Sequence, residues 1–398
     1  MKLFQTFNEE EFSKNWRVIV AGFVMAFFAW GMIFYAHGVF KAVLEAKYGW
    51  SAVLMSFAQT WFWFVGAIAA FLAGAVIDRL GPRTVAYYGA AATAFGLVAI
   101  TFVNDPWQLF LAYAILATAY PPIGNLGISA ALAPIFEKHY ATALSLALTG
   151  ASLGGAIVTP LYIFLTSVLG FEMASWILAA ITFISLTAIL RWTPTPPLTS
   201  KSVPNESGVE AFRSAIKSPI FWVIWLTGLF SFTGQVGFLF QEISIFLPRM
   251  GLENAGYAVS LTVIAAAFGR FILGWAATIW RLGVVASGVY AVQATGLFIA
   301  LIDEGVASSF IAAFIIGLAV GPVVMLPAML IRAAFGPNGF GKIFGLSSVG
   351  MFGGMMIGPG ITGLISSYIG TQEALSGLVA CQLVSAVLIF FWFKSRVD

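Results

Sequence analysis

Charged residues are scarce in this chain. Asp, Glu, Lys and Arg make up 9% of its 398 residues, whereas soluble globular proteins devote about a quarter of their residues to charge. The single cysteine, Cys381, excludes an intrachain disulfide. The two histidines form no H-E-x-x-H motif and no complete P-loop is present. The sequence therefore predicts no metal ion, no other cofactor, no ATP hydrolysis and no catalytic site.

The sequence contains long hydrophobic runs and few charged residues. Hydrophobic residues make up 60% of the chain, and the mean hydropathy is +0.96. A helix needs about 20 apolar residues to cross the hydrocarbon core of a bilayer. Twelve such runs predict an all-α membrane protein with twelve transmembrane helices, at 18–45, 52–78, 84–103, 107–131, 142–168, 172–192, 219–248, 255–279, 284–302, 307–333, 343–369 and 374–393.

Basic residues gather on one side of these predicted helices. With a cytoplasmic start, 15 of the 19 Lys and Arg residues fall in cytoplasmic segments. Lys41, Lys47 and Arg249 fall on the opposite side, and Arg270 lies inside a helix. This positive-inside pattern predicts a multi-pass protein of the cell inner (plasma) membrane, surrounded by lipid, with both termini cytoplasmic. The net charge of +3 belongs to the loops and indicates no nucleic-acid partner.

A proline-rich, polar segment divides the twelve runs into two sets of six. It predicts an N-terminal six-helix bundle at 1–192, a cytoplasmic linker at 193–218 and a C-terminal six-helix bundle at 219–398. The two halves repeat features at an offset near 200 residues: the pair Gly154-Gly155 and Pro160 matches the pair Gly353-Gly354 and Pro359, and Pro122 matches Pro322. We interpret this repeat as a duplication that yields two pseudo-symmetric bundles. Such bundles rock against each other to expose a central site to each side in turn.

The segment after the second run carries the pattern G-x-x-x-D-R-x-G-x-R, formed by Gly74, Asp78, Arg79, Gly81 and Arg83. The pattern resembles the cytoplasmic loop signature of the major facilitator superfamily. In physical terms, glycine permits a tight turn and close helix packing, and the aspartate suits a helix N-terminus or a cation. The resemblance implies the major facilitator fold, with this motif acting as a cytoplasmic gate between the halves.

Two further segments, 134–155 and 335–346, also resemble this superfamily. Within it, they are most similar to the branch that includes the monocarboxylate transporters and the oxalate:formate antiporters. The resemblance covers nearly the whole chain.

Arg270 falls near the middle of the eighth run. An arginine at that depth costs about 3 kcal/mol to insert unless it faces a polar cavity. Its guanidinium stays charged and pairs with a carboxylate through two hydrogen bonds, so it suits an organic anion. The resemblance implies the same role, because an arginine at the matching place binds anions in monocarboxylate transporters. The alternative is a structural arginine paired with carbonyl groups or with a carboxylate.

The chain also departs from that branch. Ala266 stands where monocarboxylate transporters often have an aspartate, and Phe34 stands where they have a lysine. Oxalate exchangers use a second cation in the eleventh helix, but this chain has no charge there beyond Lys342. One central cation favours a monocarboxylate over a dicarboxylate and leaves the coupling ion open.

Further candidates lie on other predicted helices. Phe34 and His37 share a face of the first run, and His37 titrates near neutral pH when unperturbed. Tyr120 and Asn125 add a hydroxyl and an amide on the fourth run, and Glu242 is the other protonatable residue. We expect substrate binding by Arg270, His37, Phe34, Tyr120 and Asn125, and proton coupling by His37 or Glu242. A packed, non-functional role is the alternative for His37, and an interfacial one for Glu242.

Together these features predict a secondary active transporter of a small organic anion, a monocarboxylate above all. Transport would proceed by alternating access, coupled to a proton or to a counter-anion. One alternative is an efflux carrier for lipophilic compounds, which the aromatic content would serve. An alternative of another class is a membrane receptor that binds a ligand without translocating it.

Overall fold

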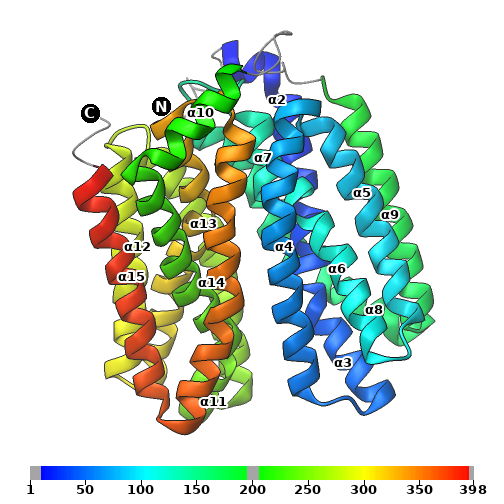
Figure 1. The fold of residues 1–398 in the computed structure, drawn as a ribbon. Coiled ribbons are helices and arrows are strands. Elements are labelled where there is room, and N and C mark those ends of the chain that lie inside the picture. The colour runs from blue at the N-terminus through cyan, green and yellow to red at the C-terminus, as the bar shows by residue number, and fades with distance from the viewer. Residues whose placement is uncertain (1–9, 195–205, 394–398) are drawn as a thin grey trace. The chain divides into compact units, whose positions relative to one another are not determined.

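The computed structural model describes residues 10–194 and 206–393, and every regular element in these ranges is a helix (Figure 1). Twelve of the described helical segments are long and apolar enough to cross a membrane, which confirms the predicted number. Their bounds differ from the predicted ones by a few residues, except that the first begins at Glu10 and not at residue 18. The hydrophobic runs therefore fixed the position of every membrane span.

The first six spans consist of ten helical elements, because several spans contain a break. The elements are α2 (Glu10–Phe28), the π-helix η1 (Ala29–Phe34), α3 (Ala36–Tyr48), α4 (Ala52–Leu80), α5 (Pro82–Ala99), the 3₁₀ turn η2 (Ile100–Phe102), α6 (Pro106–Ile123), α7 (Asn125–Leu132), α8 (Tyr140–Leu169) and α9 (Phe171–Trp192). The fourth span, predicted as one run, is interrupted at Gly124 between α6 and α7.

The remaining elements are α10 (Glu206–Lys217), α11 (Pro219–Ala276), α12 (Leu282–Ile302), α13 (Val306–Phe335), α14 (Phe340–Tyr368) and α15 (Thr371–Phe393). The 58-residue α11 holds two spans, which join at Gly251. Gly251 has φ +77°, a left-handed backbone conformation that favours glycine over residues with a Cβ. This glycine therefore ends the seventh span and allows the eighth to start without an intervening loop.

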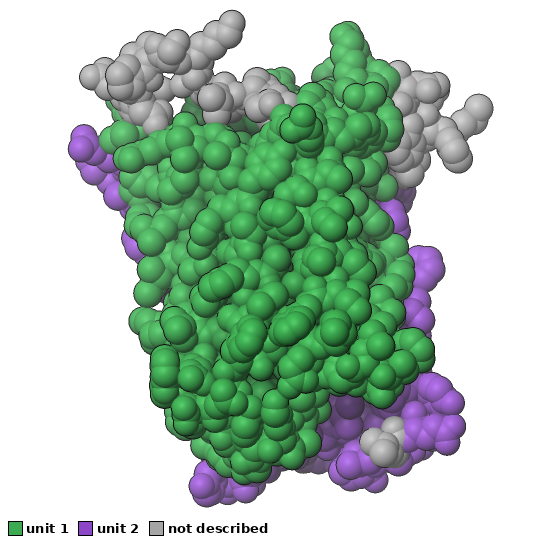
Figure 2. Space-filling model, turned by 90° about the vertical axis from the view of Figure 1, so that its right-hand side faces the viewer, with its two compact units in different colours: residues 1–212, 337–346 green, residues 213–336, 347–398 purple. Residues whose placement is uncertain are grey.

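The chain divides into two compact units, which Figure 2 distinguishes by colour. Unit 1 comprises residues 1–212 and 337–346, and unit 2 comprises residues 213–336 and 347–398. The first turns of α14 thus group with unit 1. The division into halves at 192 and 219 stays a prediction.

In unit 1, glycines on α8 let this helix approach α2 closely. An added Cβ at Gly150 would lie 2.1 Å from the carbonyl oxygen of Phe23, and one at Gly154 would lie 2.2 Å from that of Phe27. Both distances are shorter than any van der Waals contact. Small residues at such positions are what allow membrane helices to pack backbone against backbone.

Unit 2 repeats this contact between α14 and the first span of α11. An added Cβ would lie 2.6 Å from the carbonyl oxygen of Trp225 at Gly350, and 2.4 Å from that of Leu229 at Gly354. These glycines stand 200 residues after their counterparts in unit 1. The repeated contact supports the interpretation of the two halves as a duplication.

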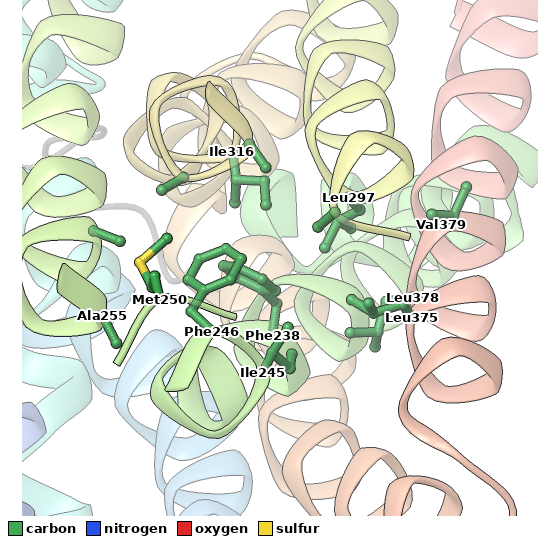
Figure 3. Packing of buried hydrophobic residues seen from close by; sticks show 14 residues of the cluster. Phe238, Ile245, Phe246, Met250, Ala255, Leu297, Ile316, Leu375, Leu378 and Val379 are labelled. Atoms are coloured by element: carbon green, nitrogen blue, oxygen red, sulfur yellow. The ribbon is translucent and has the colours of Figure 1, made fainter. Parts of the chain in front are cut away.

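A cluster of buried apolar side chains fills unit 2 between α11, α12, α13 and α15 (Figure 3). Phe238 and Phe246 lie one turn before and one turn after residue 242 on α11, and both are fully buried. Ile316 of α13, Leu297 of α12 and Leu378 of α15 contribute to the same cluster. The surroundings of residue 242 are therefore apolar.

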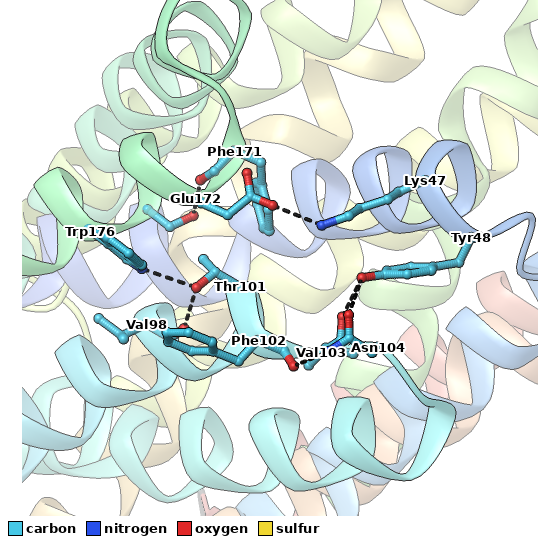
Figure 4. A network of polar contacts seen from close by, with 11 residues as sticks. Lys47, Tyr48, Val98, Thr101, Phe102, Val103, Asn104, Phe171, Glu172 and Trp176 are labelled. Atoms are coloured by element: carbon cyan, nitrogen blue, oxygen red, sulfur yellow. Dashed lines mark hydrogen bonds and ion pairs between the residues drawn. The ribbon is translucent and has the colours of Figure 1, made fainter.

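One end of unit 1 is held by hydrogen bonds between its helix ends (Figure 4). The Tyr48 hydroxyl at the end of α3 donates to the carbonyl oxygen of Val103 at 2.7 Å, and its oxygen lies 3.0 Å from Asn104 Oδ1. Lys47 forms a 2.8 Å ion pair with Glu172 at the start of α9. These contacts join the end of the first span to the ends of the third and sixth.

Unit 2 holds the matching helix end with an arginine. The Arg249 guanidinium donates to the carbonyl oxygen of Ala300 at 2.7 Å and to that of Asp303 at 3.4 Å. Asp303 stands 200 residues after Val103, the acceptor in unit 1. The two units thus use different side chains, Tyr48 and Arg249, to hydrogen bond the end of the matching helix. We call these contacts the helix-end contacts.

Candidate functional site

The first span of unit 1 contains a six-residue π-helix, Ala29–Phe34, between α2 and α3. Helix α8 presses on it, because an added Cβ at Gly31 would lie 2.7 Å from Val158 side-chain carbons and 3.0 Å from the Gly154 carbonyl oxygen. A π-helical turn changes the direction of the side chains that follow, and such turns are frequent at functional sites.

Aromatic side chains gather beside this π-helix. The Trp30 and Tyr120 rings have centroids 5.5 Å apart, those of Phe34 and Trp63 are 5.7 Å apart, and those of Trp63 and Tyr120 are 6.0 Å apart. We call Trp30, Phe34, Trp63 and Tyr120 the aromatic cluster. It joins η1, α4 and α6, and it brings together two predicted substrate-binding residues, Phe34 and Tyr120.

His37 lies one turn beyond Phe34 and is 6% exposed. Its ring stacks on Tyr113 with a centroid distance of 4.9 Å and meets the edge of Phe62 at 4.5 Å. Among the described residues, neither ring nitrogen has a hydrogen-bond partner. His37 is thus surrounded by aromatic rings, and its predicted roles in substrate binding and proton coupling stay predictions. The sequence reasoning missed Phe62 and Tyr113, although aromatic residues at helical spacing in neighbouring spans were an available signal.

Asn125 is the first residue of α7, immediately after the break at Gly124. The buried Asn125 Oδ1 accepts a hydrogen bond from the Ser129 hydroxyl at 2.9 Å. Tyr120 belongs to the aromatic cluster through its contact with Trp30, whereas the break at Gly124 separates Asn125 from α6, the helix that carries Tyr120. Its predicted contact with substrate stays a prediction.

The loop motif after the second span forms a compact contact within unit 1. Asp78 accepts hydrogen bonds from the backbone amides of Gly341 at 2.9 Å and Lys342 at 2.8 Å. These amides belong to the first turn of α14, where free N–H groups favour an anion. An added Cβ at Gly74 would lie 2.1 Å from the Gly341 carbonyl oxygen. The acid and this glycine therefore act together at the start of α14.

The other motif residues shape the turn. Gly81 has φ +84° and connects the end of α4 to the start of α5. Arg83 donates a 3.3 Å hydrogen bond to the carbonyl oxygen of Arg191 at the end of α9. Arg79 is exposed. The motif thus divides into a capping part, a turn and a link to α9.

In unit 2, Arg270 is 4% exposed on the second span of α11. The side chain crosses α13 at Gly321, where an added Cβ would lie 2.8 Å from Arg270 Cγ and 2.2 Å from the Ala266 carbonyl oxygen. A residue larger than glycine at 321 would displace the arginine. The absence of a Cβ at Gly321 therefore leaves room for Arg270 inside unit 2.

Glu242 is 1% exposed on the first span of α11. Its Oε1 lies 2.5 Å from the hydroxyl oxygen of Thr262, on the second span of the same helix. The structure therefore places this carboxyl inside unit 2, and both its predicted proton coupling and the interfacial alternative stay predictions. The sequence reasoning missed Thr262, because no motif marks a lone threonine in an apolar run.

The family model of the Major Facilitator Superfamily matches residues 19–346, and the chain belongs to this family. It is 26% identical to an MFS-type transporter of Gibberella moniliformis over 95% of this chain and 89% of that protein. It is 26% identical to MFS-type transporter 1 of Ophiocordyceps over 66% of this chain, and to the fujikurins efflux protein of Gibberella fujikuroi over 64%. The chain spans 59% and 56% of the length of these last two relatives.

The fold is similar to that of the fucose:proton symporter of E. coli, with a TM-score of 0.74 at 15% identity, over 96% of this chain and 99% of that one. The predicted fold class, an all-α protein with twelve transmembrane helices in the major facilitator arrangement, is confirmed. The protein is accordingly an integral, multi-pass membrane transporter of a small molecule and not an enzyme.

Proposed function

We propose that the protein exports a lipophilic small molecule. The observation that carries this proposal is the aromatic cluster of Trp30, Phe34, Trp63 and Tyr120, in which rings from three helical elements pack together. Binding sites for small molecules are lined mainly by apolar and aromatic side chains. Relatives described as efflux proteins, for fujikurins and for aspyridones, support the same function.

A lipophilic solute suits such a surface for a physical reason. It gains about 25 cal/mol for each Å² of apolar surface that leaves water. An aromatic pair in a tilted or edge-on arrangement adds about 0.5–1.5 kcal/mol. We infer that a flat, ring-containing compound binds at the aromatic cluster, with Asn125 and His37 as the neighbouring hydrogen-bonding residues.

A small organic anion is the second candidate substrate. The buried Arg270 favours it, because a guanidinium binds a carboxylate through two hydrogen bonds. The resemblance to monocarboxylate transporters and oxalate:formate antiporters stays a prediction, and the fungal relatives favour the efflux reading over it. A lipophilic substrate that carries an acidic group would use both the aromatic cluster and Arg270.

We propose alternating access as the mechanism, with both termini cytoplasmic and the plasma membrane as the location. The bias of basic residues towards one side supports this orientation. The contact of Asp78 with the amides of Gly341 and Lys342 would then lie on the cytoplasmic side. We infer that this contact forms and breaks during each transport cycle.

Export is tested with purified protein in liposomes that are preloaded with a neutral, fluorescent polyaromatic dye. We expect wild-type protein to accelerate dye release and Trp30→Ala to reduce it. The matched control is Trp107→Ala, because Trp107 is 64% exposed and lies 13 residues before Tyr120 on α6, about 20 Å along the helix. Transport of lactate or pyruvate without dye release would favour the anion carrier, and binding without release of either would indicate a receptor.

A further inference from the structure

The carboxyl of Glu242 lies among apolar side chains. Phe238 and Phe246 flank it on α11, and both are fully buried in the cluster of Figure 3. Thr262 supplies the hydrogen-bonding partner of this carboxyl, at 2.5 Å. An ionised carboxylate in such surroundings needs a counter-charge or several hydrogen bonds, because burial of an unpaired charge is very unfavourable.

The hydrogen bonds around Thr262 cannot all be donated by its hydroxyl. The Thr262 oxygen lies 2.5 Å from Glu242 Oε1, 3.1 Å from the Ala258 carbonyl oxygen and 3.2 Å from the Ala313 carbonyl oxygen. A hydroxyl has one hydrogen and can accept hydrogen bonds through its lone pairs, whereas a carbonyl oxygen can only accept. If the Thr262 hydrogen goes to Ala258 or Ala313, the hydrogen between Thr262 and Glu242 comes from Glu242.

A neutral Glu242 allows two of these hydrogen bonds to form in sequence. Its carboxylic O–H donates to Thr262, and the Thr262 O–H donates to a backbone carbonyl. In the part of the chain that the structure describes, an ionised Glu242 would have one neutral hydrogen bond for a full charge, and it would take the Thr262 hydrogen away from both carbonyls. The geometry therefore matches the protonated acid.

The basic residue nearest to Glu242 along the helix is Arg249, and its guanidinium faces elsewhere. It is hydrogen bonded to the Ala300 carbonyl oxygen at 2.7 Å and lies 3.8 Å from the Glu304 carboxylate. Seven residues of helix separate Glu242 from Arg249, or about 10 Å of rise. Arg249 is thus engaged at the helix end.

The other charged groups on the helices packed around Glu242 lie further along those helices. Arg270 is eight residues, or about 12 Å of helix, beyond Thr262, and Arg332 of α13 is 19 residues, or about 28 Å, beyond Ala313. The acidic residues Glu253 of α11 and Glu373 of α15 are exposed. Arg281 stands immediately before α12, and Asp303 and Glu304 follow that helix.

We propose that Glu242 is the proton-binding carboxyl of this transporter and that Thr262 is the positioning residue that holds its acidic proton. A hydronium ion on one side of the membrane gives its proton to the carboxylate, which leaves water and the neutral acid, and the acid returns that proton to water when Glu242 reaches the other side in another state of the cycle. This inference deepens the proposed export by naming its energy source, and it rests on export only for the direction of proton flow.

The helix that carries Thr262 also links this site to Arg270. Thr262, Ala266 and Arg270 are spaced by four residues and share one face of α11. This face packs on glycines of α13, where an added Cβ at Gly317 would lie 2.6 Å from the Thr262 carbonyl oxygen. A shift of α13 would therefore move the proton site and the arginine together.

The first test detects the proton without any substrate. Infrared difference spectroscopy of the purified protein is recorded across a pH titration, and a protonated carboxylic acid gives a C=O band that shifts in D₂O. We expect Glu242→Gln to remove one such band and Thr262→Val to shift its frequency, whereas Thr262→Ser leaves it in place. The matched control is Glu253→Gln, an exposed acid on the same helix, which keeps the band. If the Glu242→Gln spectrum keeps every carboxylic acid band of the wild type, the proposal is overturned.

The second test measures coupling in liposomes loaded with the fluorescent dye, with and without an imposed pH gradient. We expect the gradient to accelerate dye release by wild-type protein and by Glu253→Gln, and to have no effect on Glu242→Gln. Thr262→Val displaces the midpoint of the pH profile by about one pH unit, the effect of one hydrogen bond, and Thr262→Ser restores it. A gradient that drives Glu242→Gln as well as wild type contradicts the proposal.

The two tests separate this inference from the proposed export. If the protein releases no dye but the infrared band depends on Glu242 and Thr262, the substrate proposal fails and the proton site stands. If the dye is released and no band depends on Glu242, export stands and the proton site fails. If Glu242→Gln does not fold, the comparison of Thr262→Val with Thr262→Ser decides the question in the same two assays.

Discussion

The two units of this transporter share their backbone contacts and differ in what they bury. Glycines at equivalent positions, Gly154 and Gly354, allow the same helix approach in both units. Unit 1 buries Trp30, Trp63 and Tyr120 of the aromatic cluster, whereas unit 2 buries Glu242 and Arg270. A duplicated framework has therefore kept the residues that bring helices together, while the buried side chains have diverged. The difference suggests that each unit has its own task in transport.

The largest loss of stability is expected at the glycine contacts that the two units share. Gly154→Leu and Gly354→Leu each force a side chain into a neighbouring backbone carbonyl, and overpacking of this kind costs about 3 kcal/mol. We expect both variants to lose most of their thermal stability in detergent. Gly360→Leu on α14 is the control, because an added Cβ there meets nothing within 4 Å. A tolerated substitution at one position only would show that the shared contact stabilises only one unit.

A second prediction concerns a position where the aligned residues differ. In the duplication, Trp280 of unit 2 stands where unit 1 has Asp78, since both precede the sequence Arg-Leu-Gly. Asp78 binds two amides of α14, and each hydrogen bond to a charged group contributes about 1.5–3 kcal/mol. We expect Asp78→Ala to slow dye export by about tenfold, equivalent to 1.4 kcal/mol in a barrier.

Trp280→Ala is the matched control for Asp78→Ala. Trp280 is exposed, and its ring contacts Trp275 on the same unit. Dye export should therefore stay near the wild-type rate. Equal losses in both variants would mean that the motif acts through general stability and not through the contact with α14.

The helix-end contacts of Tyr48 in unit 1 and Arg249 in unit 2 allow a direct comparison of unfolding free energies, with smaller expected losses. Arg249→Ala removes a charged donor that is 5% exposed, which should cost about 1.5–3 kcal/mol of unfolding free energy. Tyr48→Phe removes a neutral donor and should cost about 1 kcal/mol. Glu304→Gln should change little, because that carboxylate is 63% exposed and its ion pair is long. Thermal unfolding of the three variants tests this order, and a Tyr48→Phe loss above that of Arg249→Ala would reverse it.

The smallest effect is expected at the exposed ion pair of unit 1. Lys47 and Glu172 are about half exposed, and such pairs contribute roughly 0–1 kcal/mol. Lys47→Met should lower the melting temperature slightly at low salt and not at high salt, where the charges are screened. A loss that persists at high salt would assign the contribution of Lys47 to packing.

The membrane spans and the α14 cap were accessible from the sequence for a simple reason. A span is a local hydrophobic run, and the Asp78 motif is a contiguous pattern whose chemistry suits a helix N-terminus. The same local reading missed the break at Gly124, because Pro121 and Pro122 interrupt hydrogen bonding while the run stays apolar enough to be read as one span. Local patterns therefore gave the spans but not their interruptions.

The candidate sites were harder to predict because they depend on contacts between distant segments. Phe62 and Tyr113 surround His37 from two other helices, and Thr262 meets Glu242 across a gap of 20 residues. Hydropathy cannot distinguish a threonine that binds a carboxyl from one that bonds its own helix. Arg270 was recognised because a single charge inside an apolar run stands out in the sequence. Its partner helix residue, Gly321, was not.

The most direct test of the account is a measurement of dye export as a function of dye concentration and pH for wild type, Trp30→Ala and Glu242→Gln. If unit 1 recognises the solute and unit 2 binds the proton, Trp30→Ala raises KM and keeps the wild-type pH profile. Glu242→Gln then flattens the pH profile and keeps KM near the wild-type value. A pH profile that remains intact in Glu242→Gln, or one that is lost in Trp30→Ala, would contradict this division between the two units.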